Sequence, residues 1–584
     1  MPDRPRLTPL RRLARAHGIA LAYDHGPVPD ATLRTILSGL GVAADAHPPT
    51  AAPEPADLVA AHLPPWLTDR PAWGVFCQLY ELRSARNWGI GDFADLAELA
   101  RLCGAAGADF LGVNPLHALF AARPGHASPF SPSNRRFLNP LYVAPDALGC
   151  AEPDLAALRA ADRVDYAAVS AIKMQALRQA FDAFPGAPAF DAFVAEGGEP
   201  LRLHALHEVI STLHGGAGWP DWPAALREPT SPEVARLAAD RTDDLRFHLW
   251  LQWVARTQLA EAQRAALDAG MRLGLYLDLA VGEAPDGSAT WSGVAARLPG
   301  VTVGAPPDMF STTGQGWGLA APSPVALREA GFEPFRAMIR AQLRDAGALR
   351  IDHAMALRQL FLIPDGAPPR DGAHLRYPLP DLMRVLAEES HAAGAVVIGE
   401  DLGWVPDGFR EAMAAANVLS YRIAVFEQDA EGFVPPEAYP SLALACLSTH
   451  DLPVLSQWWR GDDIARRETH GLIPPEDAEA QRAHRRRERR WMLRWAGLTA
   501  DPRRTSAPPG LTEAAYRTLA RAPSRLVGVR LADLAGPEAP TNVPGVTEDA
   551  YPNWRPRSPT PLADLARAPM FRAVTAALSE ARPR

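Results

Sequence analysis

The stretch "ALRIDHAMAL" (residues 348–357) combines the pattern of a buried strand with charged side chains. Because side chains alternate across a strand, Leu349 and Ile351 share one face while Arg350 and Asp352 share the other. A packed apolar layer has no place for a guanidinium and a carboxylate. The carboxyl ends of barrel strands do, since β/α barrels carry their reactive groups there. The stretch therefore predicts a barrel strand with an inward-facing charged pair, and a buried structural ion pair is the alternative interpretation.

Seven further apolar runs end in polar residues in the same way, and helical patterns separate them. These runs are 73–84, 108–119, 272–282, 395–403, 419–427, 443–453 and 524–534. Eight buried strands alternating with helices predict an α/β fold, a (β/α)8 TIM barrel. A doubly wound open sheet is the second candidate, but it normally carries a glycine-rich phosphate turn after its first strand. The segment "ELRSARNWGIGDF" (81–93) is not such a turn.

The spacing of the runs divides the chain into four predicted parts. Residues 1–67 form an N-terminal segment with two short helices and a Pro/Ala-rich linker, and residues 68–150 form the first part of the barrel. The alanine-rich stretch 151–244 has a helical pattern, so we expect a helical subdomain inserted into the barrel. Residues 245–584 complete the barrel and include a glycine-rich loop at 304–319.

Composition excludes several classes of function. The net charge of −8 disfavours partners such as nucleic acid and anionic membranes, which attract basic surfaces. Lys173 is the only lysine, which rules out a phosphate-binding G-x-x-x-x-G-K-[ST] loop and argues against Schiff-base catalysis. The four cysteines include no C-x-x-C pair, and no apolar run approaches the ~20 residues of a membrane helix. These features predict a cytoplasmic protein.

Two further strand ends carry carboxylates. Glu400 follows the apolar run "AVVIG" and shares a face with Ile398, so we expect it to point inward beside Asp352. A helix-capping role is the alternative for this cluster, and it suits Asp401 better than Glu400. Asp451 lies at a third strand end, in "LSTHDLP".

Three carboxylates at three strand ends of one barrel indicate chemistry rather than packing. Two facing carboxyl groups are the equipment of retaining glycoside cleavage, in which one attacks the sugar and the other protonates the leaving oxygen. The clusters lack the spacing of zinc ligands, and the chemistry needs no metal. We therefore expect no cofactor and no metal.

The motifs "LRIDH" (349–353), "IGEDLG" (398–403) and "STHDLP" (448–453) resemble those of glycoside hydrolase family 77, the 4-alpha-glucanotransferases of the alpha-amylase clan. The resemblance continues, in the family's order, through the segments 82–93, 128–143, 274–282, 304–319 and 542–555. It implies a retaining enzyme that moves α-1,4-glucan segments from a donor to the 4-hydroxyl of an acceptor glucan or glucose. Its partners would be maltooligosaccharides and other α-1,4-glucans.

The same resemblance implies roles for particular residues. Asp352 would be the nucleophile, Glu400 the general acid/base and Asp451 the transition-state stabiliser. The implied substrate contacts are Arg350, His450, Asp308, Gln315, Trp317, Asp278 and Phe130.

Tyrosine is frequent in the family where Phe130 stands, which would retain stacking on a sugar but lose a phenolic hydrogen bond. The segment around Asp278 departs from the pattern of the smaller members. Among the tryptophans, Trp317 and the adjacent Trp458 and Trp459 lie near the motifs and are candidates for sugar stacking.

Two other functions remain compatible with these motifs. A hydrolase or branching enzyme of the same clan shares the catalytic carboxylates, and an inactive glucan-binding protein shares the fold. The segment "GAPPDMFSTTGQGWGL" (304–319) resembles the transferases' own loop and favours transfer. We expect this loop to close over the site and exclude water, with an ordinary surface connection as the alternative. The sequence leaves the oligomeric state open.

Overall fold

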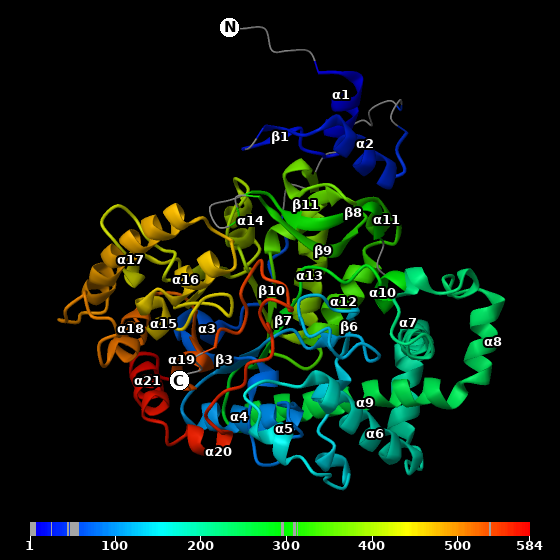
Figure 1. The fold of residues 1–584 in the computed structure, drawn as a ribbon, viewed down its shortest axis with the longest axis horizontal. Helices are drawn as coiled ribbons and strands as arrows, with labels where there is room; N and C mark the ends of the chain where they lie inside the picture. Colours follow the sequence, from blue (N-terminus) through cyan, green and yellow to red (C-terminus); the bar gives the residue numbers. More distant parts are fainter. Residues whose placement is uncertain are drawn as a thin grey trace.

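Eight parallel strands form a barrel at the centre of the molecule (Figure 1). The computed structural model describes residues 7–24, 26–43, 46, 58–293, 297–307, 311, 313–535 and 539–584. The barrel strands are β3 (Ala72–Cys77), β4 (Phe110–Val113), β7 (Gly274–Leu279), β10 (Ala348–Ile351), β13 (Val396–Gly399), β14 (Ser420–Ile423), β15 (Ala443–Cys446) and β16 (Leu526–Arg530). Each predicted apolar run contains one of these strands, so the predicted (β/α)8 barrel is confirmed.

The strands follow one another around the barrel in chain order. The hydrogen-bonded order is β13-β10-β7-β4-β3-β16-β15-β14, and every pair in it is parallel. A single parallel bridge between Ile398 and Leu419 joins β13 to β14 and closes the barrel. The amide of Leu419 donates to the Val397 carbonyl at 2.9 Å, and the amide of Gly399 donates to the Leu419 carbonyl at 2.8 Å. The pairing between β13 and β14, here called the β13–β14 seam, therefore involves fewer residues than the ladders between the other strands.

Helices connect and surround the strands. They are α3 (Pro65–Asp69), α4 (Phe93–Ala105), α9 (Thr242–Asp268), α10 (Ser288–Trp291), α11 (Pro324–Glu329), α12 (Glu333–Leu343), α13 (Leu379–Ala393), α14 (Phe409–Ala415), α15 (Leu455–Arg460), α16 (Asp462–Thr469), α17 (Pro475–Trp495), α18 (Leu511–Leu519), α19 (Leu531–Ala535), α20 (Leu562–Leu565) and α21 (Pro569–Ala581). The start of α4 is fixed by a capping box, in which Asp92 accepts from the amide of Asp95 and the Asp95 carboxylate accepts from the amide of Asp92. One continuous apolar core runs from the N-terminal helices through the barrel to α21.

A helical region lies between β4 and β7, on one side of the barrel (Figure 1, right). It follows the hairpin of β5 (His117–Ala118) and β6 (Asn134–Leu138), and comprises α5 (Ala156–Ala160), α6 (Tyr166–Asp182), α7 (Pro188–Leu213) and α8 (Pro232–Asp240). Helix α7 is kinked at Gly198, whose φ is 54°, just before Pro200. Proline lacks the amide that continues a helical ladder, so the kink forms there. Helix α9 then packs against both α7 and α4 and returns the chain to the barrel.

A second sheet is formed by the chain segments that follow β7 and β10. Its antiparallel strands lie in the order β12-β11-β8-β9, with bounds β8 (Arg297–Ala305), β9 (Gln315–Pro322), β11 (Gln359–Pro364) and β12 (Ala373–Arg376). The predicted loop 304–319 therefore begins in β8 and ends in β9, and these two strands pair as a hairpin. Asp308 lies outside the described residues.

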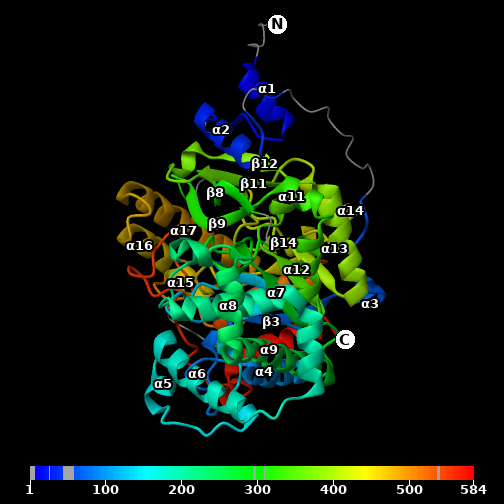
Figure 2. The same cartoon turned by 90° about the vertical axis from the view of Figure 1, so that its right-hand side faces the viewer.

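The N-terminal segment packs on this second sheet, away from the helical region (Figure 2). It consists of α1 (Pro9–Ala16), β1 (Ala22–Tyr23), β2 (Gly26–Pro27) and α2 (Asp30–Gly39), so its two predicted helices form. The amide of Ala20 donates to the His374 carbonyl at 2.8 Å, and the amide of Arg376 donates to the Gly18 carbonyl at 3.0 Å. Gly18 has a φ of +78°, and a Cβ there would meet Arg376 Cβ at 3.1 Å, which explains glycine at this contact.

The cysteines and the helices give two further findings. Cys77, Cys103 and Cys446 are buried, Cys150 is half-buried, and all four thiols are free. Within the part of the chain that the structure describes, no helix is both long enough and apolar enough to cross a membrane.

Candidate active site

Arg350 and two aspartates form a buried charge cluster inside the barrel. Arg350 on β10 lies in register with Asp278 on β7, so both side chains enter the barrel at one level. Its Nη1 donates to Asp278 Oδ1 at 2.6 Å, and its Nη2 donates to Asp352 Oδ1 at 2.8 Å. Both partners of the guanidinium are therefore acidic, and Asp352 has one oxygen held while the other remains for chemistry.

Glu400 reaches the same region from the next strand. Its backbone amide donates to the Ile351 carbonyl at 3.0 Å, which aligns the end of β13 with the end of β10. Glu400 Oε2 accepts from the amide of His353 at 2.8 Å, and Oε1 accepts from the amide of Leu402 at 2.9 Å. His353 has a φ of +47°, an uncommon conformation for a residue other than glycine. The turn after Asp352 thus directs an amide at Glu400.

Burial sets the protonation of this cluster. Desolvation raises the pKa of Glu400 to about 7; Arg350 opposes this shift and Asp352 adds to it. Desolvation likewise raises the pKa of Asp278 to about 7, against the attraction of Arg350. Burial also disfavours the charged guanidinium, but Asp278 and Asp352 outweigh it and raise the pKa of Arg350. Near neutral pH the site therefore combines a fixed cation with a carboxyl group able to donate a proton.

The third predicted carboxylate, Asp451, follows β15 and is more exposed. Its side chain is 43% exposed, and His450 Nε2 lies 3.4 Å from its Oδ2. Asn542 Nδ2 donates to Asp451 Oδ1 at 2.7 Å. Burial lowers the pKa of His450, with Asp451 opposing the shift. Asn542 had no predicted role, although it begins the segment 542–555 that carries part of the family resemblance.

An aromatic wall stands beside His450. The ring of Phe130 stacks on His450 with centroids 4.9 Å apart and an interplanar angle of 20°. Trp554 contacts both, with centroid distances of 5.4 Å to Phe130 and 5.6 Å to His450. The structure thus brings Phe130 to the site, together with Trp554, which had no predicted role.

The β8–β9 hairpin approaches the charge cluster through Trp317, which lies on β9. Trp317 Nε1 donates to Gln315 Oε1 at 3.3 Å. The indole also meets the edge of the His353 ring, with centroids 5.2 Å apart. Trp317 therefore contacts the residue that follows the candidate nucleophile, and Gln315 is held beside the indole.

Three residues near the motifs lie outside the site. Asp401 is fully buried and caps no helix, since the N-cap of α14 is Gly408; its carboxylate instead accepts from Ser420 Oγ at 2.7 Å and from the amide of Tyr421 at 2.8 Å. Trp458 and Trp459 were candidates for sugar stacking, but both are buried in α15. The guanidinium of Arg485 covers Trp458 at 4.7 Å, and Trp459 Nε1 donates to the Arg504 carbonyl at 3.0 Å. Their proximity to the motif in sequence was misleading.

A cavity opens beside Arg350 and Asp278. It is lined by Phe76, Cys77, Gln78, Glu81, Val113, Asn114, Tyr276, Asp278, Arg350, Tyr421, Ser448, Thr449, His450, Arg530, Ala532 and Thr541. Many of these side chains are polar and come from the ends of different strands, as a ligand rich in hydroxyl groups requires. Glu81, Asn114 and Arg530 had no predicted role, although each lies within one of the apolar runs. Burial raises the pKa of Glu81 to about 7.

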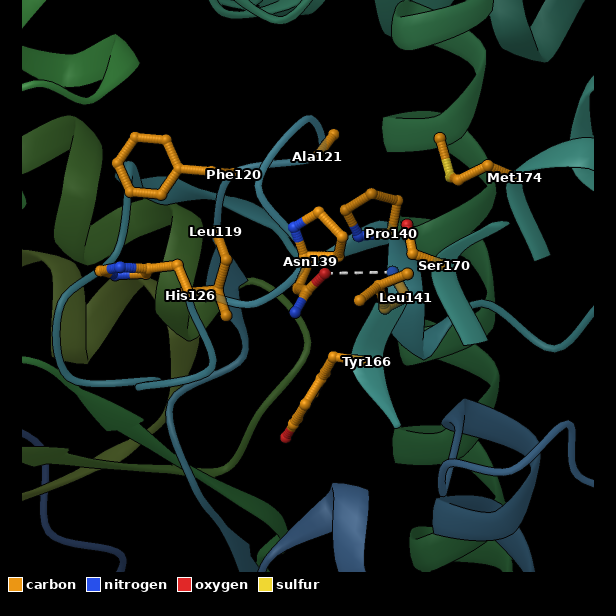
Figure 3. Close-up of a pocket in the computed structure, with 11 residues that line it drawn as sticks. Leu119, Phe120, Ala121, His126, Asn139, Pro140, Leu141, Tyr166, Ser170 and Met174 are labelled. Atoms are coloured by element: carbon orange, nitrogen blue, oxygen red, sulfur yellow. Dashed lines mark hydrogen bonds between the residues drawn. The ribbon is translucent and has the colours of Figure 1, made fainter. Parts of the chain in front are cut away.

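Figure 3 shows a second pocket, lined by residues of the segments 119–126 and 139–141 and of helix α6. Its lining is Leu119, Phe120, Ala121, Pro124, His126, Asn139, Pro140, Leu141, Tyr166, Ser170 and Met174. The polar groups are largely engaged: His126 Nε2 pairs with the Ser131 carbonyl at 2.7 Å, Tyr166 Oη donates to the Trp554 carbonyl at 2.7 Å, and Asn139 Oδ1 accepts from the amide of Leu141 at 3.0 Å. These bonds hold the segments that bear the aromatic wall, so we assign this pocket a structural role.

Comparisons with known proteins identify the family of the chain. The sequence pattern of the family described as 4-alpha-glucanotransferase, glycoside hydrolase family 77, matches residues 77–562. The chain is 40% identical over 533 residues to the 4-alpha-glucanotransferase of Mycobacterium tuberculosis (strain ATCC 25618 / H37Rv), covering 84% of this chain and 72% of that protein. It is 34% identical over 548 residues to the Haemophilus influenzae 4-alpha-glucanotransferase, covering 86% and 78%.

Solved structures share the fold. The amylomaltase of Corynebacterium glutamicum matches with a TM-score of 0.85 and 28% identity, over 98% of this chain and 99% of that one. The amylomaltase of Streptococcus agalactiae, solved in complex with acarbose, matches with a TM-score of 0.72 and 19% identity over 87% and 99%, which supports the fold alone. With its barrel, its strand-end carboxylates and these relatives, the chain belongs to the 4-alpha-glucanotransferase family, glycoside hydrolase family 77, whose activity is the transfer of α-1,4-glucan segments.

Proposed function

We propose that Asp352 is the nucleophile, Glu400 the general acid/base and Asp451 the transition-state stabiliser of a retaining glucan transfer. One observation carries this proposal. Asp352 accepts a hydrogen bond from Arg350 at 2.8 Å, and Glu400 accepts one from the amide of the residue that follows Asp352. Arg350 binds Asp352, and Glu400 is buried enough to keep a proton near pH 7. This asymmetry is what retaining chemistry needs.

The reaction proceeds in two steps with one proton exchanged. In the first, the Asp352 oxygen not held by Arg350 attacks the anomeric carbon; the bond to the leaving 4-oxygen breaks, and that oxygen takes the proton of Glu400. In the second, the 4-hydroxyl of an acceptor gives its proton to Glu400 and attacks the same carbon, releasing Asp352. The two inversions together retain the α configuration.

The surrounding residues divide the remaining work. Arg350 donates to the carboxylates of Asp278 and Asp352, so it orients Asp352. The guanidinium also lies against the sugar. His450 and Phe130 form a stacked pair suited to the face of a sugar ring at the cleavage point. Gln315 and Trp317 on the hairpin, with Asp308, complete the contacts. Asp278 acts through Arg350.

The substrates we propose are maltooligosaccharides and other α-1,4-glucans, without nucleic acid or membrane partners. The Streptococcus agalactiae amylomaltase was solved with acarbose, which supports an oligosaccharide occupant on this fold. Trp317 of the β8–β9 hairpin favours transfer over hydrolysis, because its indole meets the His353 ring and supplies an apolar surface that excludes water. The four free cysteines suit a reducing compartment, and we place the enzyme in the cytoplasm.

Incubation with maltotriose tests the proposal. A transferase converts it into glucose and into oligomers longer than maltotriose, at near-constant total number of reducing ends. Products shorter than maltotriose alone, with rising reducing ends, would indicate a hydrolase. Branch points in the products would indicate a branching enzyme, and unchanged maltotriose an inactive binding protein.

A further inference from the structure

Two exposed aromatic side chains follow neighbouring strands at the catalytic end of the barrel. The large apolar residues most exposed in the described part of the chain are Val59, Leu213, Leu267, Val325, Trp404 and Phe426. The two aromatic ones, Trp404 at 51% exposure and Phe426 at 42%, follow β13 and β14, which are neighbours. Exposed aromatic surface at the mouth of a site marks contact with a ligand more often than chance.

Trp404 is tied to the general acid/base through its own loop. The amide of Leu402 donates to Glu400 Oε1 at 2.9 Å, and Gly403 turns the chain with a φ of +80°. A chain spans at most about 3.6 Å per residue, so the Trp404 Cα lies within about 7 Å of the Leu402 Cα. Trp404 therefore belongs to the loop that directly follows the group that protonates the leaving oxygen.

The indole is also held rigidly on one face. Its ring stacks on His374 of β12 with centroids 5.0 Å apart and an interplanar angle of 29°. His374 in turn meets Phe361 of β11 at 5.0 Å, and Phe361 meets Tyr23 of the N-terminal segment at 5.6 Å. A column of rings thus backs Trp404, while the rest of the indole is open to solvent. Such a pre-organised aromatic surface binds without losing side-chain freedom.

Trp404 lies outside the cavity beside Arg350 and Asp278. That cavity receives side chains from or just after β3, β4, β7, β10, β14, β15 and β16, and none from the loop after β13. A sugar joined to Asp352 would lie towards this cavity, because Arg350 lines it and also holds Asp352. The loop that carries Trp404 is then free to meet the leaving glucan and the acceptor.

We propose that Trp404 is the stacking platform of the acceptor glucan, and that it makes the enzyme prefer acceptors of two or more glucose units over glucose. The inference rests on the proposed function, because it assigns the acceptor side from the acid role of Glu400. The apolar face of a sugar beyond the first acceptor unit would lie on the open indole face, backed by His374. Glucose alone is too short to occupy the acceptor position at Glu400 and reach the indole as well.

The test uses a maltoheptaose donor blocked at its non-reducing 4-hydroxyl, which cannot itself accept. The wild-type enzyme is assayed first with glucose and with maltotriose as acceptors. Trp404→Ala should raise the acceptor KM for maltotriose about tenfold, the loss expected for one aromatic contact. The KM for glucose and the kcat should change less than about twofold.

Two further variants serve as controls. Trp404→Phe keeps an aromatic face and should recover most of the affinity for maltotriose. Leu213→Ala removes an exposed apolar side chain of α7 and should leave both acceptor KM values unchanged.

Three outcomes separate the hypotheses. If the wild type elongates neither acceptor, the proposed function itself fails. If it elongates both and Trp404→Ala has no effect, or raises the KM for glucose as much as that for maltotriose, the platform role is wrong. A raised KM in Trp404→Ala that Trp404→Phe does not recover would also contradict stacking.

Discussion

Asp278 and Arg350 form a buried ion pair of 2.6 Å at matched positions on neighbouring barrel strands. Since the guanidinium is planar and its nitrogens are fixed relative to one another, fixing one edge on Asp278 also fixes the edge that meets Asp352. The direction of the nucleophile is therefore determined one strand away from it.

Asp278→Asn should lower kcat by about 100-fold, the penalty for misplacing a reacting group by about 1 Å. The substitution removes the charge that anchors Arg350 but keeps the shape of the side chain. Asp345→Asn is a matched control, because Asp345 forms a partly buried pair with Arg256 at 3.0 Å away from the site. The two variants should lose similar thermal stability, and only Asp278→Asn should lose activity in the maltotriose assay. Equal kcat values for both variants would mean that Asp278 has no positioning role.

Asp352→Asn should reduce turnover by about 10⁴-fold or more, because the amide cannot form the glycosyl-enzyme intermediate. Its melting temperature should stay close to that of the wild type, since the volume of the side chain hardly changes. Mass spectrometry after reaction with a fluoro-sugar donor that traps such intermediates should find the label on the peptide containing residue 352 in the wild type. A label on another carboxylate would reassign the nucleophile.

The alkaline limb of the pH profile should belong to Glu400. With a pKa of about 7, its carboxyl group is protonated below neutrality, so kcat/KM should fall as pH rises past about 7. Glu400→Gln should be nearly inactive on maltotriose and should lack this limb on a glycosyl fluoride, whose leaving group needs no proton. A Glu400→Gln profile that keeps the limb would assign it to another group, such as Asp278.

Glu400 should also lower the free energy of unfolding at high pH. The folded-state pKa of Glu400 is raised from 4.5 to about 7, so the folded protein retains a proton that the unfolded chain loses between these values. The stability that Glu400 contributes is therefore present below about pH 4.5 and is lost as pH rises through 7. Glu400→Gln carries no such charge, so its melting temperature relative to the wild type should rise between pH 5 and pH 8.

Trp317→Ala should raise the ratio of hydrolysis to transfer several-fold. It removes the indole that meets the His353 ring and helps to exclude water from the site. Reducing ends and longer oligomers are measured in the same maltotriose reaction, which makes the ratio independent of the amount of active enzyme. Val325→Ala, an exposed position elsewhere, should leave the ratio unchanged. A lower rate at constant ratio would make Trp317 a simple binding residue.

The sequence predicted the parts of the structure that depend on local periodicity. The apolar runs located all eight barrel strands, and the two-residue period of a strand turned Arg350 inward. Contacts between distant segments were beyond this reasoning. Asn542 reaches Asp451 from 91 positions away, and Trp554 reaches Phe130 from a different end of the chain.

Composition was a weaker guide than periodicity. Glycines and prolines made 304–319 look like a loop, but its ends pair as strands because β8 also finds a partner in β11, far along the chain. Trp458 and Trp459 follow the third motif closely, yet α15 turns both into the core. Whether a side chain near a motif reaches the site depended on the direction of the element that follows.

Few residues pair across the β13–β14 seam, so the backbone amides of the barrel should differ in their protection from hydrogen exchange. Where the other neighbouring strands are joined by ladders, this pair relies on one bridge and on the Asp401 carboxylate, which takes the amide of Tyr421 that a strand carbonyl would otherwise hold. Amide protons of Gly399 and Leu419 should therefore exchange with deuterium ahead of those in β3, β4 and β7. Glu400 directly follows β13, so the proposed acid/base lies on the part of the barrel wall that should open first.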